Sequence, residues 1–293
     1  MNFKYLKYKI FCILVFAFCF KATFGAGERD TSNTSRADSV VAKKRVVYKL
    51  RPAADIPITV VCGAWSGYLE ATQISNKTPP TTAQILNLNK NDVNFIDRLG
   101  MYPYNSYIDN ISYYPFYAAI PLPLLFFLTG DDMRSDYLKL GFLYLETLSV
   151  TGLFGTSATF FVDRYRPYAY DPNTPLDKKI TPGSKNSFYA GHVEIIATST
   201  FFISEIYSTY YPESKIKWLF FGLSGVATAG MGYMRSRAGM HFPSDIFAGA
   251  ATGTLSGILV PYFHNHKVIK NPALSFEPYS DDNTYGLTMV YKF

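Results

Sequence analysis

Cysteine, tryptophan and histidine are scarce in this chain, which has three, two and four of them among 293 residues. Cys12 and Cys19 lie in an apolar stretch near the N-terminus, and removal of that stretch would leave Cys62 as the one remaining cysteine. A single cysteine forms no internal disulfide and cannot build a cysteine-based metal site. We therefore expect neither a disulfide framework nor a bound metal or other cofactor.

A strong charge of one sign and a strongly apolar composition are also lacking. The net charge is +6 and hydrophobic residues make up 48% of the chain, while the mean hydropathy is +0.02. This balance is apolar for a soluble protein but polar for one with many membrane spans. The positive charge suits an anionic partner such as a phosphorylated substrate or an anionic lipid. The abundant Tyr and Phe indicate packing, and we expect no nucleic-acid partner.

The N-terminal segment has the order of a secretory signal. A basic end precedes the apolar run 10–20, and small residues follow as far as Ala26. This order predicts a signal peptide over residues 1–26 and export of the mature chain, with an uncleaved anchor as the alternative. Residues 27–52 are polar and charged, and we interpret them as a solvated lead-in.

Apolar patterning predicts an all-α domain over residues 53–265, followed by a short β-hairpin over residues 266–293. Polar joints separate six blocks long enough for helices, at about 53–72, 112–129, 137–162, 191–208, 215–234 and 244–263. A bundle of about six helices follows, and it could be embedded in a membrane. The final stretch alternates apolar and polar residues on both sides of an SDDN turn, which is typical of a hairpin.

Candidate catalytic residues gather in three clusters at the ends of the apolar blocks. The clusters read TFFVDRYRP over 159–167, SFYAGH over 187–192 and RSRAGMHFPSD over 235–245. Among the four histidines, only His192 and His241 fall in these clusters, whereas His264 and His266 lie beyond the last block. A helical bundle would bring the three clusters together at one end.

These residue types suit the transfer of a phosphoryl group. Arg166 and Arg235 can bind phosphate oxygens and stabilise the charge of the transition state. His241 can act as the nucleophile, with Asp245 holding its second ring nitrogen, and His192 can protonate the leaving oxygen. Taken singly, an arginine at a helix end often reaches solvent and an aspartate often caps a helix, so the joint spacing carries the hypothesis.

The three clusters resemble the signature of the type 2 phosphatidic acid phosphatases and vanadium haloperoxidases, in the form of a bacterial exported member. That signature is Lys-x6-Arg-Pro, then Pro-Ser-Gly-His, then Ser-Arg-x5-His-x3-Asp. The resemblance implies that Arg166 and Arg235 bind phosphate, that His192 is the acid, and that His241 is the nucleophile oriented by Asp245. It covers about residues 53–263. The segment NDVNFIDR, residues 91–98, also looks like the stretch before the second helix of bacterial members, without a catalytic role that we can assign.

Three departures from the signature affect the expected activity. Thr159 stands in place of the Lys, Tyr189 and Ala190 in place of Pro-Ser, and Met234 in place of the Ser before the arginine of the third motif. We expect Arg164 to substitute in part for the lost lysine. Gly191 leaves room for its backbone N–H to approach the oxyanion, so the predicted phosphate-binding set is completed by Gly191, Arg164 and Thr159.

The function predicted from these residues is hydrolysis of a phosphomonoester or pyrophosphate through a phosphohistidine. We expect a lipid phosphate as substrate and a membrane-associated enzyme of the cell envelope whose site faces the periplasm. Five spans would place all motifs outside, since the apolar run 56–65 of the first block is too short to cross a bilayer. The alternatives are a soluble periplasmic bundle, a vanadate-dependent haloperoxidase, and a degenerate phosphate-binding envelope protein.

Overall fold

The structure is a computed structural model that describes residues 46–265, 274–281 and 284–291. The predicted signal peptide and residues 27–45 of the polar lead-in lie outside the described residues. Six longer helices are α2 (Pro52–Tyr68), α5 (Ser106–Ala119), α8 (Tyr137–Phe161), α10 (Gly191–Tyr210), α11 (Ile216–Arg237) and α12 (Pro243–His264). The short helices are α3 (Thr82–Leu86), α4 (Phe95–Arg98), α6 (Leu122–Phe126), α7 (Asp131–Ser135) and α9 (Leu176–Lys179).

The expectation of about six helices is wrong, because the described residues form eleven α-helices. Two causes account for the difference. The block expected at 112–129 is divided at Ile120–Pro121 into α5 and α6, and the polar joints fold into short helices of their own. Side-chain caps stabilise two of these: Thr81 accepts a hydrogen bond from Gln84 N–H, and Asn94 accepts one from Asp97 N–H.

Further short elements complete the description. A π-helix, Leu69–Ile74, continues α2, and 3-10 turns cover Lys90–Asp92, Pro167–Tyr170 and Pro182–Lys185. Strands β1 (Leu274–Asp281) and β2 (Thr284–Tyr291) pair antiparallel, with Leu274 opposite Tyr291 and Asp281 opposite Thr284. The strands supply no residue of the candidate site described below.

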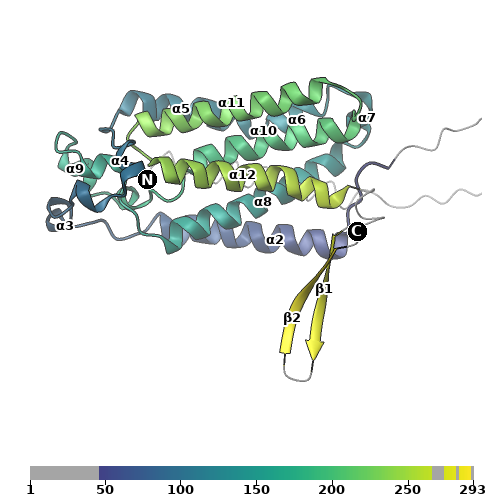
Figure 1. Cartoon of the computed structure of the whole chain (residues 1–293), viewed down its shortest axis with the longest axis horizontal. Helices are drawn as coiled ribbons and strands as arrows, with labels where there is room; N and C mark the ends of the chain where they lie inside the picture. The colour runs from purple at the N-terminus through teal and green to yellow at the C-terminus, as the bar shows by residue number, and fades with distance from the viewer. Residues whose placement is uncertain (1–45, 266–273, 282–283, 292–293) are drawn as a thin grey trace, which may run out of the picture. The chain divides into compact units, whose positions relative to one another are not determined.

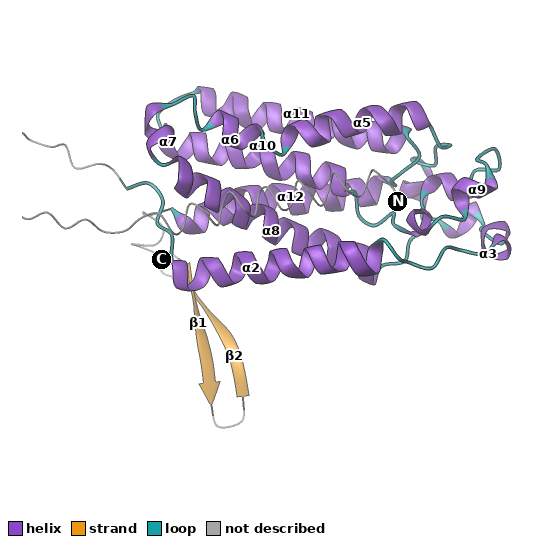
Figure 2. Ribbon diagram, turned by 180° about the vertical axis from the view of Figure 1, so that it is seen from behind, coloured by secondary structure: helices purple, strands orange, loops and turns teal. Residues whose placement is uncertain are grey.

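The longer helices lie side by side as a bundle, and α3, α4 and α9 gather at one of its ends (Figures 1 and 2). Helix α10 is central, since it packs against α12, α11, α5 and α8. Part of the core lies where α8 meets α10, with Leu140, Leu143, Phe202 and Ile206 all buried. Burial of such side chains is the main favourable contribution to folding.

Three glycines on α12 allow its backbone to approach α10 closely. Gly249, Gly253 and Gly257 are spaced four residues apart and therefore lie on one face of the helix. A Cβ atom would lie 2.6 Å from the carbonyl oxygen of Ala190 at Gly249, and 2.7 Å from that of Thr198 at Gly257. Because the first of these contacts is at the start of α10, the glycines also fix where α10 begins relative to α12.

The surfaces of α11 and α12 expose many large apolar side chains. They include Trp218, Leu219, Leu223, Val226, Tyr233, Phe247, Leu255 and Leu259. Among the described residues, α12 alone is long and apolar enough to cross a membrane, and 28% of its apolar window is buried within the protein. A surface of this kind is typical of contact with lipid or with another protein.

Candidate active site

The three motif clusters meet at the end of the bundle where α10 and α12 begin. Backbone hydrogen bonds join them: Ser187 N–H donates to Arg164 O at 3.0 Å, and Tyr168 N–H, next to the first cluster, donates to Gly239 O at 3.1 Å. Ala190 N–H donates to Asp245 O at 3.2 Å. The convergence predicted from the sequence is therefore present, although it depends on loop backbone as well as on the helices.

Arg166 is fixed in place by two carbonyl oxygens. Its Nε–H donates to Gly183 O at 2.8 Å, and a terminal N–H donates to Met240 O at 3.0 Å. The same terminal nitrogen lies 3.2 Å from Nε2 of His241. No carboxylate of the described part of the chain forms an ion pair with Arg166, so its charge is available to an anion.

Arg235 is buried, with 1% of its surface exposed, and is oriented by α5. One terminal nitrogen donates to Asp109 Oδ1 at 2.7 Å and to Ser112 Oγ at 2.8 Å. Its Nε has no hydrogen-bond partner among the described residues. A buried guanidinium with one ion pair and a donor to spare is suited to bind a second anion.

His241 is held in a single tautomer by the backbone. Its Nδ1 lies 2.6 Å from the carbonyl oxygen of Ser187, which can only accept, so Nδ1 carries the proton and Nε2 carries a lone pair. Burial, then the charges of Arg166 and Arg235, hold the pKa of this imidazole well below 6.5. A neutral ring with an unprotonated Nε2, which here accepts from a terminal N–H of Arg166 at 3.2 Å, is the form that a nucleophilic histidine requires.

His192 lies in the first turn of α10, against two rings of α5. It stacks on Phe116 at 4.4 Å between centroids and meets Tyr113 edge-on at 4.7 Å. Its buried Nε2 has no hydrogen-bond partner among the described residues. Burial, then the charges of Arg235 and Arg166, lower the pKa of His192 well below its ordinary value.

Asp245 has other partners than the expected ring nitrogen of His241, because that nitrogen is engaged by Ser187. The Asp245 carboxylate accepts the hydroxyl proton of Ser187 at 2.6 Å and the backbone N–H of Phe242 at 2.9 Å, and it forms an ion pair with Arg164. The bond to Phe242 N–H closes the first turn of α12. Asp245 therefore contacts the residue that holds His241, and reaches the imidazole through it.

Arg164 and Thr159 have partners that occupy their polar groups. Arg164 forms ion pairs with both Asp97 and Asp245, and its guanidinium lies 4.5 Å from the ring centre of Phe242. The hydroxyl of Thr159 donates to Gly155 O at 3.0 Å inside α8. The charge of Arg164 is thus balanced by two carboxylates, which is the physical reason that it is a poor substitute for the missing lysine.

Gly191 is the first residue of α10, where backbone N–H groups have no partner within the helix. A Cβ atom at Gly191 would meet nothing within 4 Å. The end of the helix is therefore open beside this residue, and the approach of an oxyanion to it stays a prediction.

Several residues of the site were missed in the sequence analysis. Asp97 accepts hydrogen bonds from the backbone N–H and the hydroxyl of Ser244, at 2.9 and 2.8 Å, and so fixes the start of α12. Asp109 and Ser112 position Arg235, and Ser187 positions His241. For Asp97 the segment 91–98 was a signal without a mechanism. Ser187 lay in the second motif cluster but was given no role, and nothing in the sequence singled out Asp109.

Two arginines and two imidazoles around one helix start define a helical protein with a site chemically suited to a phosphoryl group. Residues 140–269 match the family model described as PAP2 superfamily. The family resemblance inferred from the motifs is thereby confirmed, and the family supports a phosphatase of the PAP2 type. A bacterial and exported origin stays a prediction.

Among the solved structures that are similar is one described as "the first transmembrane PAP2 type phosphatidylglycerolphosphate phosphatase from Bacillus subtilis". It shares 22% sequence identity over 72% of this chain and 94% of that chain, with a TM-score of 0.37. A search of curated proteins gives no match.

Proposed function

We propose that this protein is a PAP2-type phosphatase that hydrolyses a phosphomonoester or pyrophosphate of a lipid, with His241 as the nucleophile. The observation that carries the proposal is the state of His241. Its Nδ1 is committed to Ser187 O, and Nε2 lies 3.2 Å from an arginine that has no carboxylate partner in the described part of the chain.

In the first step the lone pair of Nε2 attacks phosphorus and the bond from phosphorus to the leaving oxygen breaks. Arg166 and Arg235 stabilise the charge on the remaining phosphoryl oxygens. His192 gives its proton to the leaving oxygen. In the second step water attacks the phosphohistidine, His192 takes a proton from that water, and the bond between phosphorus and Nε2 breaks, which releases phosphate and restores both imidazoles.

His192 must carry a proton to act as the acid, although its pKa is lowered in the free enzyme. The charges of Arg235 and Arg166 contribute to that lowering. A bound phosphate dianion offsets both charges and so raises the pKa of His192 relative to the free enzyme. Burial is the largest cause of the lowered pKa of both imidazoles, and the two arginine charges come next for each. Substrate binding therefore favours protonation of His192, while the Nε2 lone pair of His241 is used in the attack on phosphorus.

The apolar surface of α11 and α12 supports membrane association and a lipid substrate. Location of the site on the periplasmic side belongs to the same proposal and rests on the signal-like N-terminus. Hydrolysis of a membrane-impermeant phosphoester by intact cells that express the full chain tests this location. Activity that appears only after lysis would contradict it.

Phosphate release by the full-length protein in detergent tests the catalytic proposal. Substrates are phosphatidate, a polyprenyl pyrophosphate and the soluble p-nitrophenyl phosphate. We expect release from at least one lipid, loss of at least a thousandfold in kcat for His241→Gln, and a phosphorylated enzyme after rapid alkaline quenching of the wild type only. Phosphate binding without turnover would instead identify a degenerate site. Halide oxidation with added orthovanadate would favour the haloperoxidase alternative.

A further inference from the structure

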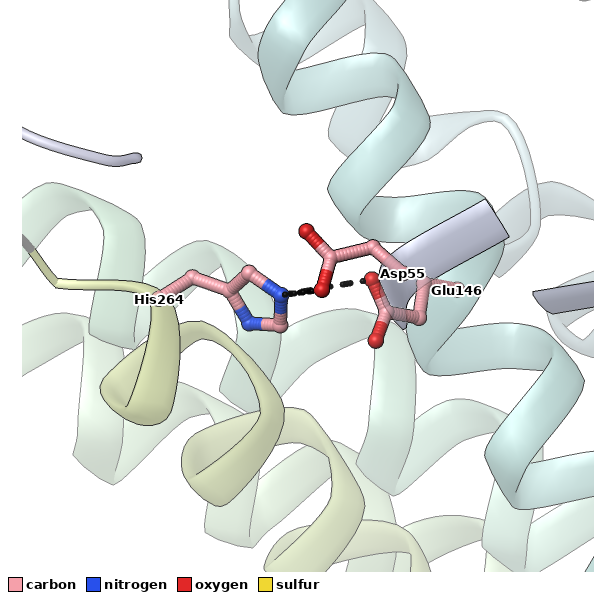
Figure 3. Close-up of side chains that lie close together, drawn as sticks. All are labelled: Asp55, Glu146 and His264. Carbon is pink, nitrogen blue, oxygen red and sulfur yellow. Dashed lines mark ion pairs between the residues drawn. The ribbon is translucent and has the colours of Figure 1, made fainter. Parts of the chain in front are cut away.

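A second cluster of ionisable side chains lies inside the bundle, apart from the candidate active site. It joins Asp55 of α2, Glu146 of α8 and His264 of α12, whose side chains converge in Figure 3. Their exposed fractions are 1%, 3% and 4%. His264 Nε2 lies 3.2 Å from Asp55 Oδ1 and 3.4 Å from Glu146 Oε2, and the three atoms lie within 4.8 Å of one another.

The hydrogen bonding of His264 leaves this cluster with acceptors only. Nδ1 lies 2.8 Å from the carbonyl oxygen of Val260, so Nδ1 carries a proton that it donates. In the neutral ring, Nε2 then presents a lone pair to two carboxylate oxygens. None of these three atoms has a hydrogen-bond partner among the described residues. Three buried acceptors that face one another need a metal ion or a proton between them.

Charge and geometry favour a divalent metal over a proton on Nε2. A divalent ion accepts lone pairs from both carboxylates and from the neutral imidazole at the same time, whereas Nε2 has a single proton to share between two carboxylate oxygens. Among the described residues, Arg51 also pairs with Asp55 Oδ1, at 4.0 Å, and it is 53% exposed. Ligands about 2.1 Å from a tetrahedral zinc ion are separated by about 3.4 Å, close to the two separations from His264 Nε2.

The cluster is also held as metal ligands usually are. The backbone N–H of Arg51 donates to Asp55 Oδ2, which leaves Oδ1 directed at the cluster. The bond from His264 Nδ1 to Val260 O fixes the orientation of the imidazole. Histidines that bind metals are usually held by such a bond from their other ring nitrogen. Helix α12 has 22 residues, so its two ends are separated by about 33 Å. The cluster at its last residue is therefore far from His241, which precedes its first.

We propose that Asp55, Glu146 and His264 bind one divalent transition-metal ion, which ties α2 to α8 and α12. Two carboxylates and one imidazole suit Zn²⁺ or Mn²⁺, with water completing the coordination. The ion has a structural role, since its ligands come from three helices and none belongs to the candidate active site. The proposal does not depend on the proposed function.

Metal content and thermal unfolding of the full-length protein test this site. The protein in detergent is treated with a chelator, desalted, and titrated separately with Zn²⁺ and Mn²⁺. We expect one equivalent of at least one metal to stay bound after desalting. We also expect that metal to raise Tm by roughly 5–10 °C at a free concentration about a hundredfold above its Kd.

Matched variants assign the binding to the cluster. Glu146→Gln and His264→Asn should lose the bound equivalent and the rise in Tm, while Glu205→Gln, a partly buried glutamate of α10 outside the cluster, should retain both. His241→Gln should also retain both, which separates this test from that of the active site. Failure of the wild type to bind either metal would overturn the proposal and identify a protonated His264 as the cation.

Discussion

Ser187→Ala separates two ways in which Asp245 could act on His241. In the structure Asp245 accepts the Ser187 hydroxyl at 2.6 Å, and the Ser187 carbonyl accepts Nδ1–H of His241 at 2.6 Å. The substitution removes the hydroxyl and its bond to Asp245, but it keeps the backbone carbonyl that accepts from His241. A hydrogen bond to a charged group contributes about 1.5–3 kcal/mol. If the loss of this hydrogen bond raises the free energy of the transition state by about 1.4 kcal/mol through the position of His241, kcat falls about tenfold.

The assay is steady-state phosphate release, with kcat and KM determined separately. We expect kcat to fall and KM to change little, because the proposed phosphate ligands are Arg166 and Arg235 and include neither Ser187 nor Asp245. Asp245→Asn should also lower kcat, and the double variant should lose less than the product of the two effects, since both changes break one connection. Ser199→Ala, another fully buried serine, should lower stability without changing kcat. If Ser187→Ala keeps full kcat while Asp245→Asn does not, Asp245 acts on the ring directly and the reasoning is refuted.

Three further predictions follow from other contacts. Arg235→Lys should lower kcat/KM about a hundredfold because the forked donor is lost, while Arg237→Lys, two residues along α11 and exposed, should not. Gly253→Ala should lower the free energy of unfolding in urea by roughly 2 kcal/mol, since its Cβ would meet the backbone of α10, whereas Gly222→Ala meets nothing within 4 Å and should raise it slightly. The lowered pKa of His241 means that the unfolded chain binds the proton more tightly, so the free energy of unfolding should fall below about pH 6.5, at up to about 1.4 kcal/mol per pH unit. His241→Gln should make this dependence less steep, and an unchanged slope would contradict the burial of a neutral ring.

The sequence predicted the parts of the fold that depend on local patterning. Apolar blocks located the longer helices because the buried positions of a helix recur at a regular spacing in the sequence. The division into α5 and α6, and the short helices of the polar joints, depend on single residues such as Thr81 and Asn94. These caps provide small local energies, and an argument from apolar periodicity does not detect them.

The candidate site was predictable where side chains carry the chemistry and unpredictable where the backbone does. His192, His241, Arg166 and Arg235 stood out as residue types in a spaced pattern. The partner of His241 is a carbonyl group, which every residue has, so no letter of the sequence identifies Ser187. Asp109 lies 126 positions from Arg235, outside every motif, and only the packing of α5 on α11 brings the two together.

Where the chain departs from the family signature, neighbouring side chains pack around the replaced residues. The departures also limit the positive charge of the site. Ala190 is fully buried in an apolar cluster with Val193 and Met231, so its methyl group packs where the signature has a hydroxyl. Lys77, which reaches the carbonyl oxygen of Thr159 at 2.7 Å, also pairs with Asp163 at 2.7 Å. The positive charge available to a substrate thus comes from the two arginines of the site, one of them already paired with Asp109. The two negative charges of a phosphomonoester dianion equal the positive charges of two guanidinium groups, so the wild type should hydrolyse monoesters without a further cation. The substitution Thr159→Lys should lower KM more than it raises kcat.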